Sequence, residues 1–249
     1  MQNQGTQTGN LTSYPVWDRS TRWFHWINVI CIIGLIAVAL FILNNKAFGI
    51  SNDGKVLLKM IHVYFGYVFA ANLCWRLVWG FLGNRYARWS AILPMGKHFL
   101  CSLLEYISSA RKGDAVAYKG HNPVARLMVT ALFILLTTQA ITGLTLASTD
   151  LYWPPFGDQI KEWVSDKNSS VEVRAGYKEG TDPASYKAMR DFRKPFITTH
   201  LYVFYALVIA IVLHIAGVIV TEIREKNGIV SAMFSGKKVF SKKPVDLDK

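Results

Sequence analysis

His200-Leu-Tyr-Val-Phe-Tyr-Ala-Leu-Val-Ile-Ala-Ile-Val-Leu-His214 is an apolar run with a histidine at each end. The two histidines are fourteen residues apart. On an α-helix, fourteen residues turn about 1400°, about 40° short of four full turns, so both imidazoles lie on one face. The same residues rise about 21 Å, which is most of the ~30 Å hydrocarbon core of a bilayer. The stretch therefore predicts a membrane helix with one imidazole near each side of the membrane.

The composition of the whole chain also indicates a membrane protein. Of 249 residues, 51% are hydrophobic and 18% are charged, and the mean hydropathy is +0.22. Soluble domains carry about 25% charged residues. The net charge is +12, but the charges lie between the apolar runs. This pattern indicates membrane topology, and no nucleic-acid-binding motif accompanies it.

The cysteines and the N-terminus exclude several classes of site. Cys31, Cys74 and Cys101 have no CxxC or CxxCH spacing, which argues against a disulfide framework, a zinc site and covalently attached haem. We expect all three to be small buried apolar side chains. The polar N-terminus lacks the basic region and cleavage site of a signal peptide, so we expect the first apolar run to be an uncleaved anchor.

Four apolar runs are long enough to span a membrane, and they predict one all-α domain over residues 1–249, a four-helix integral membrane bundle. The runs are 24–43, 60–82, 123–147 and 196–221. Segment 95–111 follows Pro94 and is amphipathic, so we expect a helix that lies on the cytoplasmic membrane surface.

The charge balance of the connecting segments predicts the orientation of the spans. From Arg76 to Arg126 there are eight basic and two acidic residues, whereas from Asp150 to Lys194 there are eight of each. The positive-inside rule then places both termini and the 83–122 segment in the cytoplasm, and the 44–59 and 148–195 loops in the periplasm or outside. We expect this loop to be the docking surface of an external partner and the lysine-rich tail to be a cytoplasmic anchor.

The direction of each span assigns a depth to each histidine within it. His25 opens the first span on the cytoplasmic side, and His62 opens the second span on the outer side. His200 is then outer and His214 inner, so His25 pairs with His214, and His62 with His200. Two neutral imidazoles suit the axial positions of a six-coordinate haem iron, so the pattern predicts two haems b. For any one of them, the alternative is a buried histidine bonded to a neighbouring helix.

Other residues near the spans have both a structural and a functional interpretation. His98 and His121 either have structural roles or contribute to a quinone pocket or proton path. Arg22 and Arg126 either contact haem propionates or anchor helix ends at the interface. Each span also has a glycine that lets a flat macrocycle approach or lets helices pack: Gly34, Gly66, Gly143 and Gly217.

An ordered set of short motifs covers most of the chain. The motifs are Arg22-Trp-Phe-His25-Trp26, Arg76-Leu-Val-Trp-Gly-Phe-Leu-Gly-Asn-Arg-Tyr-Ala-Arg88, Gly120-His-Asn-Pro123, Ile141-Thr-Gly143 and the His200…His214 spacing. Over about residues 15–240 the chain resembles the bacterial cytochrome b561 superfamily, and most closely the b-type cytochrome subunit of Ni/Fe-hydrogenases. The resemblance implies four membrane helices, b-type haem, and electron transfer between a periplasmic partner and the quinone pool. It also implies axial ligand roles for His25, His62, His200 and His214.

The leading hypothesis is a di-haem electron-transfer subunit. A hydrogenase-like subunit or a c-type cytochrome docks on the 148–195 loop, and a bound quinone lies near the cytoplasmic side. No catalytic residue is assigned, and the chain is either an electron-transfer subunit of an oxidoreductase complex or one that also holds a quinone site. Two alternatives are a histidine-based transporter of protons or metal ions, and a structural anchor for a redox complex.

Overall fold

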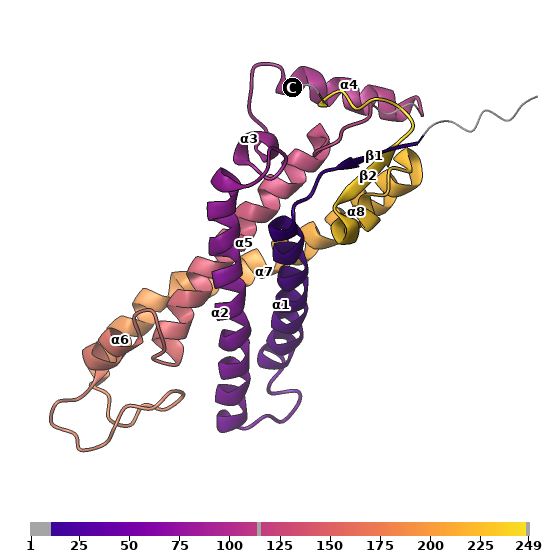
Figure 1. Ribbon diagram of the computed structural model, residues 1–249. Coiled ribbons are helices and arrows are strands. Elements are labelled where there is room, and N and C mark those ends of the chain that lie inside the picture. Colours follow the sequence, from indigo (N-terminus) through magenta and orange to yellow (C-terminus); the bar gives the residue numbers. More distant parts are fainter. Residues whose placement is uncertain (1–10, 114–115, 248–249) are drawn as a thin grey trace, which may run out of the picture. The chain divides into compact units, whose positions relative to one another are not determined.

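The computed structural model describes residues 11–113 and 116–247, and this part of the chain is mostly helical (Figure 1). Most of the polar N-terminal segment lies outside the described residues. The elements in chain order are β1 (Thr12–Pro15), α1 (Arg19–Leu43), α2 (Asn52–Leu82), α3 (Trp89–Ile92), α4 (Phe99–Arg111), α5 (Pro123–Asp150), α6 (Gly157–Val164), α7 (Pro183–Glu225), α8 (Ile229–Ser235) and β2 (Lys237–Phe240).

Four of the described helices, α1, α2, α5 and α7, are long and apolar enough to cross a membrane. Only 6–17% of the most apolar stretch of each helix is buried within the chain. The remaining apolar surface faces outward, as it does in a lipid environment. The prediction of a multi-pass helical membrane protein is therefore confirmed, with the addition of the two short strands.

All four of these helices extend further than the predicted spans, and α2 and α7 extend furthest. Helix α2 begins at Asn52 rather than near residue 60, and α7 begins at Pro183. The segment predicted as a loop over 148–195 therefore contains α6 and the first turns of α7. The reason is that hydropathy marks only the apolar part of a helix, whereas polar residues continue these helices beyond the membrane core.

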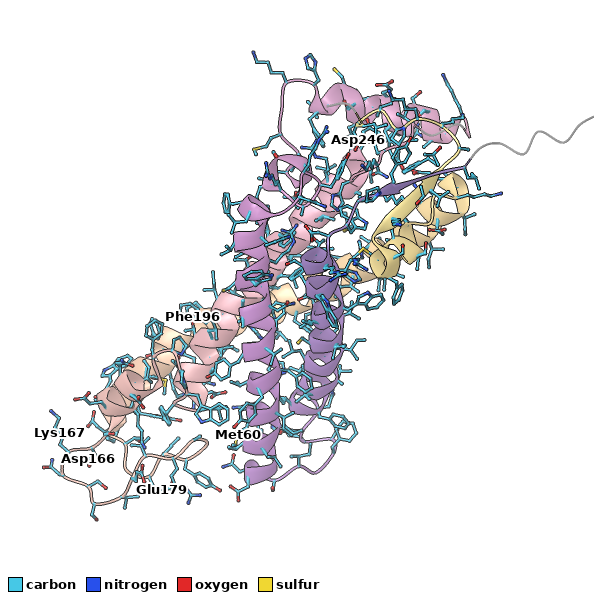
Figure 2. The ribbon with its side chains drawn as sticks, viewed as in Figure 1. Met60, Asp166, Lys167, Glu179, Phe196 and Asp246 are labelled. Carbon is cyan, nitrogen blue, oxygen red and sulfur yellow. The ribbon has the colours of Figure 1, made fainter. Side chains whose placement is uncertain are left out.

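The chain divides into two compact units, and unit 2 comprises Trp26–Trp75 and Phe133–Ile209. In unit 2, Asp150 at the end of α5 pairs with Lys59 of α2 at 2.6 Å and with Arg193 of α7 at 2.5 Å. The segment after α6 carries Asp166, Lys167 and Glu179 (Figure 2), and it packs on a small core. The buried residues of this core are Val164, Val173 and Met189.

Unit 1 comprises Met1–His25, Arg76–Leu132 and Ala210–Lys249. Strands β1 and β2 pair antiparallel, with Thr12 opposite Phe240 and Pro15 opposite Lys237. This pairing ties the start of the chain to the C-terminal segment, next to α8 (Figure 1). The buried residues of the unit 1 core are Val16, Trp17, Tyr86 and Ala232.

Helix boundaries in unit 1 follow the capping residues. Asn122 accepts a hydrogen bond from the Ala125 backbone N–H at 2.8 Å, and Pro123 is the first residue of α5. The predicted surface helix is α4, which begins at Phe99 and exposes Leu100 and Leu104. Such an exposed apolar face suits a helix that lies on a membrane surface.

The cysteines differ from the expectation of three buried side chains. Cys31 is buried, but Cys74 and Cys101 are exposed and none is in a disulfide. Cys74 lies on an outward face of α2, and Cys101 lies on α4. The prediction was wrong for these two because an apolar surface that faces lipid is exposed within the isolated chain.

Candidate cofactor site

The structure brings together the outer pair of predicted ligands within unit 2. The imidazole of His62, on α2, and that of His200, on α7, have ring centres 6.4 Å apart and planes at 74°. Both side chains are half-buried. Two imidazoles that bind one metal ion with bonds of about 2 Å have ring centres about 6 to 6.5 Å apart. The spacing of His62 and His200 therefore fits one metal ion between them.

The hydrogen-bond neighbours of His200 favour the tautomer with the proton on Nδ1. The single hydroxyl hydrogen of Thr142 is donated to the Thr138 carbonyl at 2.8 Å. The Thr142 oxygen, 2.9 Å from Nδ1 of His200, then accepts the Nδ1–H. This tautomer leaves a lone pair on Nε2, the nitrogen that such a hydrogen bond makes ready for a metal. Gln139 lies 3.1 Å from that nitrogen and donates an N–H to the lone pair.

Small residues and an unsatisfied nitrogen leave room for a flat group beside the outer pair. A Cβ added to Gly66, one turn after His62, would meet no atom within 4 Å, so this side of α2 is open. A Cβ added to Gly143 would lie 3.2 Å from Cε1 of His200, so this glycine lets the imidazole approach α5 closely. Nδ1 of His62 is buried and has no hydrogen-bond partner among the described residues. These features fit a planar metal cofactor.

The inner pair, His25 on α1 and His214 on α7, lies within unit 1. The two imidazoles are near enough to interact electrostatically, and both are half-buried. A Cβ on Gly217, three residues after His214, would meet no atom within 4 Å. The inner pair therefore repeats the combination of paired imidazoles and an open glycine position.

The donor set distinguishes between kinds of metal site. Within residues 11–113 and 116–247, no group of three or more His, Cys, Asp or Glu side chains is placed to hold a metal ion. A bare ion such as zinc takes about four protein or water ligands. A haem iron takes four nitrogens from its own macrocycle and needs only two axial ligands from the protein. Isolated histidine pairs thus fit haem better than a bare ion.

The arginines predicted to contact propionates are engaged by backbone carbonyls. Arg22 donates to the Phe234 carbonyl, and Arg126 donates to the Leu93 carbonyl and to that of Ser90. These bonds hold both side chains at the ends of helices in unit 1. Their contact with haem propionates stays a prediction.

Sequence reasoning missed the residues that orient His200. Gln139 and Thr142 lie within a predicted span, and a polar side chain at that depth is itself a signal of function. The charge pattern predicts an anchor tail that includes Lys238, yet this residue is 3% exposed. The sequence allows either a structural or a functional role for His121, and its ring packs against Trp17 with centres 4.8 Å apart. Only the tertiary structure shows these contacts.

Four helices long enough to span a membrane, with imidazoles paired along them, are the features of a multi-pass membrane cytochrome of the b type. The prokaryotic cytochrome b561 family matches residues 16–236, and the chain belongs to this family. This membership favours electron transfer over the alternative of a histidine-based transporter.

Individual relatives extend the same comparison over most of the chain. The chain is 28% identical to the probable Ni/Fe-hydrogenase 1 B-type cytochrome subunit of Escherichia coli (strain K12), over 70% of this chain and 78% of that protein. It is 25% identical to the probable Ni/Fe-hydrogenase B-type cytochrome subunit of Rhodobacter capsulatus, over 92% of this chain and 82% of that protein. The corresponding subunit of Bradyrhizobium diazoefficiens is 26% identical, over 93% and 88%. No solved structure matches the chain.

Proposed function

We propose that the chain is a di-haem electron-transfer subunit that connects a periplasmic redox partner with the quinone pool. His62 and His200 hold the outer haem b, and His25 and His214 hold the inner one. The observation that carries the proposal is the 6.4 Å spacing of the His62 and His200 rings, which matches two axial ligands of one iron. Each haem supplies a one-electron carrier when bound.

The protein's own contribution is to position and insulate these carriers. Thr142 holds His200 in the tautomer that binds iron, and Gly143 allows the ring to lie close to α5. Two strong imidazole ligands leave no open position for oxygen, which suits electron transfer. The apolar spans exclude water, so the redox potential of each haem depends on nearby side chains.

The partner is a hydrogenase, by analogy with relatives named as hydrogenase cytochrome subunits. It docks on the 148–195 segment of unit 2, which the charge pattern assigns to the periplasm. Phe156 and Trp163 are exposed there, and Lys167 and Glu179 extend from the same segment (Figure 2). An apolar centre with charged neighbours suits a protein interface. The quinone site lies on the opposite, cytoplasmic side of an inner membrane.

Stopped-flow mixing of the purified protein with menadiol, a soluble quinol, tests the proposal. Menadiol should reduce the b-type haem absorbance of the unmodified protein. In His200→Ala, the remaining inner haem should still be reduced at a similar rate. In His214→Ala, reduction of the outer haem should be at least tenfold slower, because the inner haem is the entry point. Equal rates in both variants would contradict the assignment of the quinone to the inner side.

A further inference from the structure

A small cavity with polar side chains in its wall lies entirely within unit 1, the unit that holds His25 and His214. Its volume is about 30 Å³, which is room for one water molecule or the end of a small polar group. The side chains that give it its chemistry are Trp17, His121, Asn122, Thr221, Glu225 and Lys238. No residue of this cavity has a role in the function proposed above.

The cavity lies on the same face of α7 as His214. Thr221 is seven residues and Glu225 is eleven residues after His214. At 100° per residue both lie within about 20° of the direction of His214. Thr221 is about 10 Å further along the helix axis. The face of α7 that carries the proposed inner haem ligand His214 therefore also lines the cavity.

Lys238 is a buried cation with few compensating contacts. Its side chain is 3% exposed, its ammonium donates to the Gly120 carbonyl at 3.0 Å and it lies 5.6 Å from the ring centre of Trp17. An ammonium has three N–H donors. Among the described residues, no carboxylate forms an ion pair with Lys238. Burial lowers the pKa of Lys238 from 10.5 to about 8, although the carboxylates of Glu225, Asp246 and Glu222 oppose that shift.

The one carboxylate in the cavity wall is already engaged. Glu225 accepts a hydrogen bond from the Tyr106 hydroxyl at 2.7 Å on one oxygen. Its other oxygen accepts one from the Asn227 amide at 2.8 Å. Asn122 in turn donates to the Tyr106 hydroxyl at 2.8 Å. Glu225 is therefore held within its own network, and within the part of the chain that the structure describes Lys238 has the Gly120 carbonyl as a hydrogen-bond partner but no carboxylate.

His121 offers a second polar atom to the same cavity. Its Nδ1 is buried and has no hydrogen-bond partner among the described residues. Burial, together with the cations Lys238, Arg76 and Arg126, lowers the pKa of His121 to about 3. The imidazole therefore stays neutral, and one of its nitrogens carries a hydrogen that can be donated. A cavity that disfavours an added positive charge favours an anion.

We propose that Lys238 and His121 form a carboxylate site that receives a propionate of the inner haem. This inference rests on the proposed function, because it requires a haem at His25 and His214. Haem carries its two carboxylates at the edge of the macrocycle, and the cavity lies beyond His214 along the same helix face. A charge-assisted bond to a carboxylate also satisfies a lysine that is costly to bury alone.

The C-terminal segment holds this site together. Asp246, labelled in Figure 2, accepts hydrogen bonds from the backbone N–H groups of Lys119 at 2.7 Å and Gly120 at 2.8 Å. Lys238 contacts the carbonyl of that same Gly120 from strand β2. The tail thus fixes both the loop before His121 and the lysine, so it acts as part of the cofactor site and not only as a surface anchor.

Redox titration of purified Lys238→Met tests the proposal, with Lys237→Met as the matched control. Lys237 is the exposed neighbour on the same strand. Loss of the Lys238 charge should lower the midpoint potential of the inner haem by about 59 mV, a tenfold change for a one-electron couple. The outer haem and Lys237→Met should keep their potentials, and Lys238→Arg should restore the inner one. An unchanged inner potential in a Lys238→Met protein that holds both haems would overturn the proposal. Absence of haem from the unmodified protein would refute the proposed function instead.

A second measurement needs no change at Lys238 and identifies the source of the carboxylate. The His62→Ala variant, in which the inner pair is the one complete pair of proposed ligands, is stripped of haem and reconstituted with haem or with haem dimethyl ester. The ester, which lacks carboxylates, should bind about tenfold more weakly, and Lys238→Met should remove this difference. Equal binding of haem and ester would show that the haem carboxylates do not contribute to binding, and would refute the proposal.

Discussion

Thr142 shows how one hydroxyl can prepare a metal ligand. It donates to a carbonyl of its own helix and accepts the Nδ1–H of His200, so the imidazole presents Nε2. The pairing of the four histidines could be predicted because their spacing and depth are properties of single helices, and their role as haem ligands stays a prediction. Thr142 was not, because its role depends on which face of α5 meets α7, and no local pattern encodes that contact.

Replacement of Thr142 by valine should weaken the outer haem. Valine has a similar shape but cannot accept the His200 hydrogen, and loss of such a partner lowers metal affinity by about 10- to 100-fold. Haem content measured during dilution in detergent should fall faster than in the unmodified protein. Thr145→Val is the control, because Thr145 bonds only to its own helix, at the Ile141 carbonyl. Equal loss of haem from both variants would argue against the tautomer role.

His121 gives the protein a predictable sensitivity to acid. Its pKa falls from 6.5 to about 3 on folding. Below pH 6.5 the unfolded chain gains a proton on His121 that the folded chain takes up only near pH 3. The free energy of unfolding is therefore undiminished by His121 above pH 6.5 and decreases as the pH falls from 6.5 toward 3. Thermal unfolding of His121→Phe should depend less on pH between 6.5 and 3 than that of the unmodified protein. Parallel profiles would show that His121 does not titrate between the two states.

At the scale of elements, hydropathy predicted the four spans but not their full lengths. Polar residues extend α2 and α7, and ion pairs connect these extended parts with the end of α5. Asp150 accepts both Lys59 and Arg193, and all three side chains are less than one quarter exposed. The sequence shows that these charged residues are present, but it does not show that Lys59 and Arg193 both pair with Asp150.

Asp150→Asn should destabilise unit 2. The change leaves Lys59 and Arg193 facing each other without a carboxylate, in a partly buried place, at a cost of about 1–3 kcal/mol. The change in the free energy of unfolding, measured in a series of detergent mixtures, gives this cost. Asp191→Asn is the control, because Asp191 pairs with Lys187 on the exposed surface of α7, where an ion pair contributes about 0.5 kcal/mol. Similar effects of the two changes would contradict the role given to Asp150.

Helix α4 provides a direct test of the predicted orientation. Cys101 is exposed on α4, whereas Cys74 lies on a membrane span and Cys31 is buried. A charged maleimide that cannot cross membranes should label Cys101 in inverted inner-membrane vesicles, and label it poorly in intact spheroplasts. Cys101→Ser should abolish the labelling. The opposite sidedness would place the 83–122 segment in the periplasm and reverse the proposed roles of the two haem sites.

Across the whole molecule, each histidine pair falls within one compact unit. His62 and His200 belong to unit 2, and His25 and His214 belong to unit 1. The sequence predicted these pairs from span direction alone, since covalent order and membrane depth leave few other combinations. It could not predict the strand pairing that returns the tail to the start of the chain, because that contact joins residues more than two hundred positions apart.

The haem content of single-histidine variants tests the central claim most directly. A pyridine haemochrome assay on the purified protein should give about two haems b per chain. His200→Ala should retain about one haem, with the redox potential of the inner site, and His214→Ala should retain about one, with the potential of the outer site. A protein without haem, or a single haem lost in both variants, would contradict the account of two separate centres on one helix.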